Sequence, residues 1–274
     1  MQNSNSWRME LIRTATNRGR FYPAEAGEIR RMINRWNAIL DGVEDYPVSA
    51  KPKAIVAPHA GYVYSGFTAN AAHRLLGNTD AREILVVGPS HHVYFRGMSI
   101  GPFSGYETPF GILDGSKELY DFLQSGFTFT FEKRAHAVEH STETQFPFIR
   151  YYNPDASIVE LIYGDTDYRS LVPVLESVLQ RPGTAVVIST DLSHYYDQQT
   201  ANRLDAHCLE AVRHGDLMEM NRCEACGKTG LTAIIAAAIL LNLRPRLIDY
   251  RTSGDITGDY SAVVGYMSAI FNNN

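Results

Sequence analysis

The chain has 274 residues, of which 45% are hydrophobic and 20% charged, and its formal net charge is −5. This composition is ordinary for a soluble globular protein, and the acidic balance argues against a nucleic-acid partner held through phosphate contacts. The longest apolar run, at 233–240, is too short to span a membrane, and the first residues lack an apolar signal core. Three cysteines are too few for a disulfide scaffold, so we expect a cytoplasmic protein without a membrane partner.

Short apolar segments alternate with helix-like segments along the chain. Strands are predicted at 53–58, 83–89, 157–164, 184–190, 246–252 and 261–271, and helices at 66–76, 116–125, 168–181, 199–215 and 230–243. The strand segments are rich in β-branched residues and apolar on both faces, as in a covered parallel sheet. We predict an α/β fold: a three-layer sandwich around a mostly parallel central sheet. Residues 1–274 contain no repeat or linker and are expected to form one domain, with 1–13 as a loosely ordered N-terminal segment.

Polar side chains follow the carboxyl ends of four of these strands. They are His59, His91, His92, Asp191, His194 and Asp255. In open α/β sheets, ligands bind in the crevice outside the carboxyl ends of the strands. A single histidine after a strand is usually a hydrogen-bonded turn residue, but several at equivalent strand ends favour a shared site. We therefore expect these side chains to face one cleft.

Imidazole and carboxylate groups together suit a divalent first-row metal. Two histidines and one carboxylate with open positions are the facial arrangement of non-haem Fe(II), and zinc takes three such ligands plus a water molecule. These residue types leave Fe(II) and zinc open, with copper also conceivable.

Other motifs are weaker. The pair of cysteines in "CEAC" (223–226) has the spacing of a zinc half-site, but no second pair exists and Cys208 alone cannot complete it. The run "GKTG" (227–230) lacks the first glycine of a phosphate-binding loop. The remaining histidines are interpreted as packing or surface residues, or have no spacing that suggests a role: His73, His136, His207 and His214.

Five stretches, in this order, resemble the Memo family: "APHAGYVYSG", "VVGPSHH", "EHSTETQFPF", "STDLSHY" and "SGDITGDYSAVVGYMSAIF". The similarity runs from about residue 14 to 272, and "RGRFYPAEAGEIRRMI" (18–33) also looks like the opening of that family. Memo proteins resemble in fold the class III extradiol ring-cleaving dioxygenases, which are non-haem Fe(II) enzymes. In prokaryotes the family is often encoded beside a radical-SAM protein and an AMMECR-type protein, so the resemblance also implies a functional link to both.

The resemblance implies a metal site in this chain. The metal-site histidines of the family fall on His59 and His91. The third position is cysteine in the animal branch, and here Asp255 occupies it. The ring-cleaving enzymes place a carboxylate in the equivalent region, so the resemblance implies His59, His91 and Asp255 as the metal ligands and favours Fe(II) as the metal.

Three further residues match the pocket of the family. Asp191 and His194 match its second pair, in which His194 corresponds to the acid/base histidine of the dioxygenases, and His140 matches another pocket histidine. In dioxygenase-like chemistry His194 would take and return a proton. Asp191 would orient His194 or bind the metal, and His140 would steady the oxygen intermediate.

The resemblance thus implies a dioxygenase-like oxidoreductase acting on an unknown small molecule. Two alternatives remain open. The animal relatives are described as adaptors, so the chain could be a non-catalytic module that binds a metal or a peptide. A metal-dependent hydrolase using a zinc-bound water molecule is the third hypothesis. An enzyme should need His194, whereas a binding module should keep its partner without it.

Overall fold

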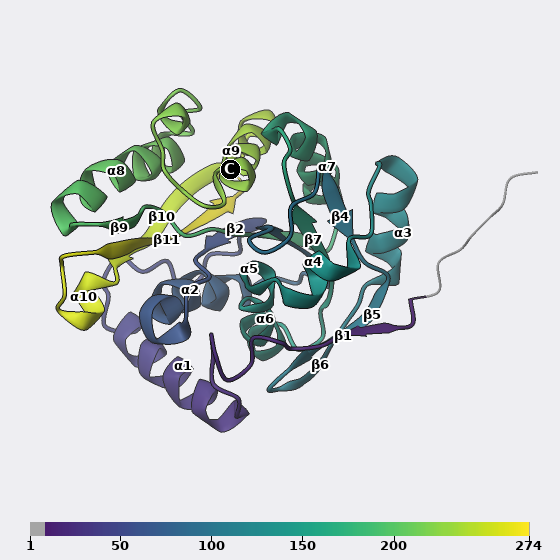
Figure 1. Cartoon of the computed structure of the whole chain (residues 1–274), viewed down its shortest axis with the longest axis horizontal. Helices are drawn as coiled ribbons and strands as arrows, with labels where there is room; N and C mark the ends of the chain where they lie inside the picture. The colour runs from purple at the N-terminus through teal and green to yellow at the C-terminus, as the bar shows by residue number, and fades with distance from the viewer. Residues whose placement is uncertain (1–8, 274) are drawn as a thin grey trace, which may run out of the picture.

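The computed structural model describes residues 9–273 of the chain (Figure 1). The strands are β1 (Leu11–Arg13), β2 (Ala54–Ala57), β3 (Glu83–Pro89), β4 (Met98–Ile100), β5 (Phe103–Thr108), β6 (Gly111–Asp114), β7 (Ser157–Tyr163), β8 (Thr184–Ser189), β9 (His194–Tyr196), β10 (Arg244–Thr252) and β11 (Val263–Asn272). The α-helices are α1 (Ala26–Leu40), α2 (Tyr62–Leu76), α3 (Lys117–Gly126), α4 (Lys133–Val138), α5 (His140–Glu143), α6 (Phe146–Tyr152), α7 (Tyr168–Gln180), α8 (Gln198–His214), α9 (Lys228–Leu240) and α10 (Gly254–Thr257). Every strand and helix predicted from the sequence corresponds to one of these elements.

The larger of two sheets has the strand order β10-β11-β2-β8-β3-β7-β4. Its four middle strands, β2, β8, β3 and β7, run parallel to one another, so the prediction of parallel strands holds for this part of the sheet. The flanking strands β11 and β4 run antiparallel to β2 and β7, and β10 runs antiparallel to β11, so the sheet is mixed rather than mostly parallel. Residues 253–262 connect β10 to β11, and this connection is too short for the crossover that a parallel pair of strands needs. The two strands therefore pair antiparallel, which the prediction of a mostly parallel sheet did not include.

Helices cover both faces of this sheet. In β3, Leu85 and Val87 pack in the core with α7 and α9, whereas Ile84 and Val86 pack on the other face with α2 and α6. This alternation follows from the two-residue period of a strand. The α/β sandwich predicted from the apolar strand segments is therefore present. Within residues 9–273, no helix has both the length and the apolar character needed to cross a membrane.

The N-terminal segment is tied into the fold. Residues 1–8 lie outside the described part, but Leu11–Arg13 form β1, which pairs parallel with β5 in a second, three-stranded sheet. The buried guanidinium of Arg13 donates to Oε2 of Glu143 at 2.8 Å and to the carbonyl of Glu139 at 2.7 Å. Residues 11–13 of the segment expected to be loosely ordered therefore form a paired strand, and the charge of Arg13 at its end is buried and paired.

Two of the three cysteines are joined. Cys208 on α8 and Cys223, in the loop before α9, form a disulfide, and Cys226 is free. From the sequence, Cys208 is considered only as a possible zinc ligand beside the pair at 223–226, whereas the structure joins it to Cys223. Sequence spacing did not indicate the bond because it depends on how α8 packs beside the loop.

Candidate metal centre

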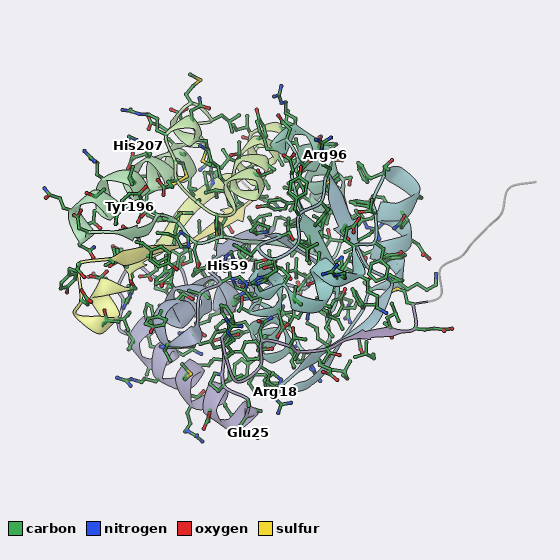
Figure 2. All side chains as sticks on the ribbon, viewed as in Figure 1. Arg18, Glu25, His59, Arg96, Tyr196 and His207 are labelled. Carbon is green, nitrogen blue, oxygen red and sulfur yellow. A yellow bond between two sulfur atoms is a disulfide. The ribbon has the colours of Figure 1, made fainter. Side chains whose placement is uncertain are left out.

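Three histidines from separate parts of the chain meet at the carboxyl ends of the parallel strands. His59 lies two residues beyond β2 and His91 two residues beyond β3, while His140 begins α5. The ring centroids of His59 and His91 are 5.0 Å apart, and that of His140 lies 5.4 Å from the first and 4.6 Å from the second. Figure 2 labels His59 near the middle of the molecule in this view. We call these three residues the histidine cluster.

The spacing of the histidine cluster fits a shared ion. One nitrogen atom of each ring lies within 4.8 Å of the other two. Nitrogen ligands of a tetrahedral zinc ion are about 3.4 Å apart when the bonds are ~2.0–2.1 Å long, so small ring rotations would bring all three onto one ion. The donor set suits a divalent first-row metal and leaves at least one position open.

Hydrogen bonds around His59 leave its Nε2 atom as the ligand atom. Nδ1 lies 2.9 Å from Oγ of Ser189, and this hydroxyl donates its own proton to the carbonyl of Ser141 at 2.5 Å. The hydroxyl must therefore accept from His59, which places the ring proton on Nδ1 and a lone pair on Nε2. Burial, followed by the neighbouring His91, holds the pKa of His59 well below its usual value, so the ring is neutral at neutral pH.

Glu139 orients His91 in the same way. Its Oε1 accepts from Nδ1 of His91 at 2.9 Å and its Oε2 from the His91 backbone N–H at 2.6 Å. Burial opposes ionisation of Glu139, but the hydrogen bonds and electrostatic attraction from His91, with help from the Ser141 N–H, outweigh it and lower the pKa to about 2. An ionised carboxylate can only accept, so Nδ1 of His91 donates, and in the neutral ring Nε2 keeps its lone pair. Metal-binding histidines usually have such a carboxylate partner.

His140 belongs to a second group with ligand spacing, formed with His92 and Glu139. Nε2 of His92 lies 3.2 Å from Nδ1 of His140. The carboxylate of Glu139 already accepts four N–H groups, including those of His140 and Ser141. It is therefore committed to positioning, and the histidine cluster is the better metal site of the two.

The Glu139→Gln variant is expected to weaken zinc binding by about 10–100-fold, the usual cost of losing such a partner. An amide offers only one accepting oxygen for four donors, so His91 loses its fixed tautomer and orientation. Competition against a chromogenic chelator measures the affinity. Glu132→Gln is the matched control, because within residues 9–273 the Glu132 carboxylate has no hydrogen-bond partner. Equal affinity in the two variants would refute the positioning role.

Asp191 and Cys226 also contact His59. Oδ1 of Asp191 accepts the His59 backbone N–H at 2.7 Å, and its Oδ2 lies 4.0 Å from Nε2. Sγ of Cys226 lies 3.2 Å from Nε2, so the thiol donates to the free lone pair. Burial raises the pKa of Asp191, and it raises that of Cys226 to about 12. Cys226 was not predicted as part of the site, because it lies 167 residues from His59 and repeats no strand-end pattern.

A cavity of about 540 Å³ opens beside the histidine cluster, and we call it the main cavity. His140, Asp191 and His194 all line it. His194 begins β9, which pairs with β11, and its ring is half-buried. The structure thus brings the expected proton-transfer residue to the wall of a cavity that also reaches the cluster.

Asp255 lies apart from the histidine cluster. Its carboxylate accepts the Thr252 backbone N–H at 2.7 Å and the Thr252 hydroxyl at 3.2 Å, and the residue is exposed. Near the start of a short helix, a carboxylate readily satisfies local donors in this way. The third ring beside His59 and His91 is that of His140, whereas the resemblance implied the carboxylate of Asp255.

A buried chain of hydrogen bonds supports His59 from behind. Gln145 donates to the hydroxyl of Ser189 at 2.9 Å and to the carbonyl of Pro58 at 3.0 Å, and its Oε1 lies 2.8 Å from Nε2 of His73. His73 is buried, in keeping with its interpretation as a packing residue. Burial lowers the pKa of His73 to about 4 and, followed by His59, that of His140 to about 3.

These low pKa values predict acid sensitivity. In the unfolded chain each histidine takes up a proton near pH ~6.5, whereas the folded protein keeps His73 neutral down to about pH 4. The free energy of unfolding should therefore fall as the pH drops below ~6.5, by about 1.4 kcal/mol per pH unit for each such histidine. Urea unfolding at several pH values measures this slope. His73→Gln should reduce this slope by about 1.4 kcal/mol per pH unit, the contribution of one proton, between about pH 6 and 5. An unchanged slope would contradict a buried, neutral His73.

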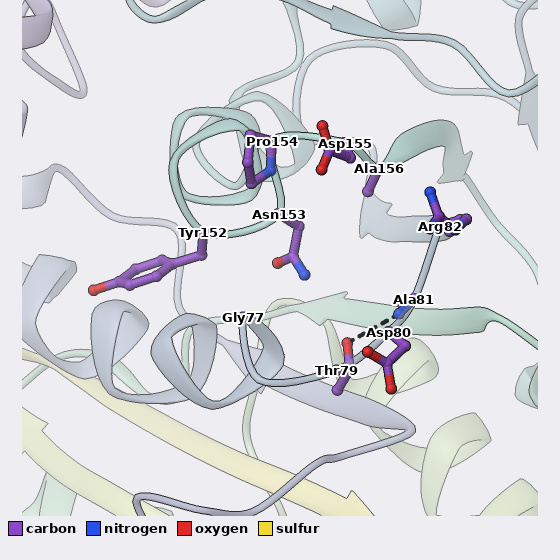
Figure 3. Close-up of a pocket in the computed structure, with 10 residues that line it drawn as sticks. All are labelled: Gly77, Thr79, Asp80, Ala81, Arg82, Tyr152, Asn153, Pro154, Asp155 and Ala156. Carbon is purple, nitrogen blue, oxygen red and sulfur yellow. Dashed lines mark hydrogen bonds between the residues drawn. The ribbon is translucent and has the colours of Figure 1, made fainter.

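A separate pocket of about 250 Å³ lies at the opposite, amino ends of β3 and β7 (Figure 3). Apart from Tyr152, the last residue of α6, the residues around it belong to the turns that precede these strands, and the drawn hydrogen bond joins Oγ1 of Thr79 to the Ala81 N–H at 3.4 Å. Among residues 9–273, no histidine or cysteine lines it. Its chemistry therefore does not match that of the main cavity.

Comparisons with known proteins agree with the whole-chain resemblance. A family model described as Memo-like protein matches residues 13–270. A MEMO1 family protein of Thermoplasma volcanium is 30% identical over 270 residues, covering 95% of this chain and 98% of the relative. A MEMO1 family protein of Aquifex aeolicus is 30% identical over 264 residues, covering 92% and 96%. A MEMO1 family protein of Archaeoglobus fulgidus is 32% identical over 267 residues, covering 92% and 97%.

Proposed function

The chain belongs to the Memo-like protein family, and on this premise we propose that it is a metal-dependent enzyme for a small molecule. His59, His91 and His140 would hold one divalent ion, and the substrate would lie in the main cavity. The observation that carries the proposal is the matched orientation of two rings: Ser189 and Glu139 each accept a hydrogen bond from Nδ1–H, which leaves an Nε2 lone pair beside the third ring.

Three protein ligands leave a coordination position for a substrate or a water molecule, and this favours a catalytic role over metal storage. Fe(II) held by His59, His91 and His140 would supply O₂ activation, the chemistry that the resemblance to the dioxygenases implies. His194, which lines the main cavity, would take a proton from the substrate and return it. Asp191 holds the backbone of His59 in place, and Phe21, which stacks on His140 with ring centroids 4.4 Å apart, holds that ring.

Hydrolysis is the second candidate function, and one observation favours it. The third member of the cluster is an imidazole rather than a carboxylate, and three histidines are a familiar donor set for catalytic zinc. Such an enzyme would need no O₂, so turnover with and without O₂ separates the two reactions.

The test combines metal analysis with activity in one variant. Protein purified without O₂ should carry about one iron or zinc ion per chain, and His194→Ala should keep that metal. Turnover of any substrate found by screening small chelating aromatics and esters should fall by about 10²–10⁴-fold in His194→Ala. Loss of the metal in this variant, or unchanged turnover, would contradict the assigned role. Metal binding without turnover of any tested compound would favour the non-catalytic module.

A further inference from the structure

The walls of the main cavity indicate what kind of molecule enters it. We propose that it binds an aromatic ligand that carries a cationic amine, with the ring against the aromatic walls and the amine beside Asp259. This inference rests on the proposed function and deepens it by naming the ligand class of the same cavity.

Aromatic side chains make up much of the wall. Phe21, Tyr64, Tyr195 and Tyr266 all line the main cavity. Tyr64 and Tyr195 remain 43% and 77% exposed, so their ring faces are available to a ligand. Phe21 stacks on His140, which extends the aromatic wall to the histidine cluster. A flat aromatic molecule can therefore contact rings from the cavity mouth to the metal site.

The exposed Tyr195 has a strained backbone conformation. Its backbone φ is +65°, a left-handed conformation that non-glycine residues rarely adopt. The flanking residues His194 and Tyr196 are fixed by pairing with β11, which leaves Tyr195 in this conformation. Strained backbone of this kind persists where surrounding structure enforces it and clusters at ligand sites. The fold thus keeps a large ring exposed beside the proton-transfer residue.

The formal charges of the wall are negative. Asp191 and Asp259 line the main cavity, and no lysine or arginine among residues 9–273 does so. Arg20, which lies 5.6 Å from the ring of Phe21, lines a different cavity. Asp191 is buried and bonded to the His59 backbone, so it is not available to a mobile cation.

Asp259 is the available carboxylate. It is exposed, and its Oδ1 accepts the backbone N–H and the hydroxyl of Ser261 at 3.0 and 2.6 Å. These hydrogen bonds lower the pKa of Asp259, so it is ionised at neutral pH, and its Oδ2 has no hydrogen-bond partner within residues 9–273. An ammonium group is attracted both to this oxygen and to tyrosine ring faces, whereas a carboxylate is repelled.

Three probes of nearly equal size test the charge preference: phenethylamine, 2-phenylethanol and phenylacetate. Calorimetry with zinc-loaded and with metal-free protein should find that the amine binds about five- to thirtyfold more tightly than the alcohol, and phenylacetate more weakly still in the metal-free protein. Asp259→Asn should lower the affinity for the amine to that for the alcohol and leave the alcohol unchanged. Tyr195→Ala should weaken both.

Asp197→Asn is the matched control, because it removes an equal charge near β9 while asparagine still caps α8. It should keep the amine preference. The proposal is overturned if the amine binds no better than the alcohol, if Asp259→Asn keeps the preference, or if no probe binds at millimolar concentration. The metal-free arm separates the two proposals: loss of the amine preference with intact zinc binding refutes only this inference, and an intact amine preference without zinc binding refutes only the metal site.

Discussion

The His59→Ala variant should lose its metal. His59 is one of three imidazoles in the cluster, and its Nε2 lone pair is held in place by the bonded Nδ1 proton. Removing a ligand should weaken zinc binding by more than the ~10–100-fold that a lost partner of a ligand costs. After dialysis against a weak chelator, elemental analysis should find about one zinc ion per wild-type chain and almost none in His59→Ala.

The control for this prediction is His207→Ala. His207 lies on α8, away from the strand ends, and its ring is bonded to Glu219 at 2.8 Å. This variant should keep the wild-type zinc content, which separates the effect of the cluster from that of removing any histidine. Equal zinc content in the two variants would mean that the histidine cluster is a group of ordinary polar side chains and not a metal site.

The Arg13→Met variant should destabilise the protein by about 3–5 kcal/mol. The guanidinium lies 2.8 Å from Glu143 and 3.5 Å from Glu160, and all three side chains are buried. Burial opposes the charge of Glu160, but Arg13 and then His136 outweigh this effect and lower its pKa, so the carboxylate is ionised at neutral pH. Without Arg13, these acids stay inside the protein with too little positive charge beside them.

Urea unfolding at pH 7 measures this loss. Arg18→Met is the control, because the exposed pair of Arg18 with Glu25 is 3.8 Å long and should contribute about 0–1 kcal/mol. Arg13 also donates to the carbonyl of Glu139, so Arg13→Met should weaken zinc binding although Arg13 contacts no histidine of the cluster. If Arg13→Met costs no more than Arg18→Met, the buried network does not stabilise the fold as described.

Local sequence patterns predicted the centre of the fold better than its edges. The segments that became β2, β3, β7 and β8 are apolar on both faces, and this property is local to each segment. The antiparallel direction of β10 and β11 depends instead on the length of the connection between them. Elements with weaker local signals, such as the three-residue strands β4 and β9, were not predicted because pairing with a neighbour defines them.

The candidate site shows the same division. His59 and His91 were found from their positions after apolar strands. His140 was linked to the pocket only through the family resemblance, since the short helix α5 has no period to read. Glu139 and Ser189 were missed because their role is to bond other residues of the site across the fold. Asp255 follows a strand as the histidines do, yet its carboxylate bonds its own turn.

X-ray absorption at the zinc edge of the zinc-loaded protein tests the central claim most directly. A metal centre formed by the histidine cluster should show nitrogen ligands at about 2.0–2.1 Å, with outer-shell scattering from three imidazole rings and no sulfur neighbour. His140→Ala should reduce the number of rings to two. A sulfur neighbour at about 2.3 Å would instead make Cys226 a ligand, and scattering from no more than one ring would show that zinc binds elsewhere. Either result would contradict a metal centre built from His59, His91 and His140.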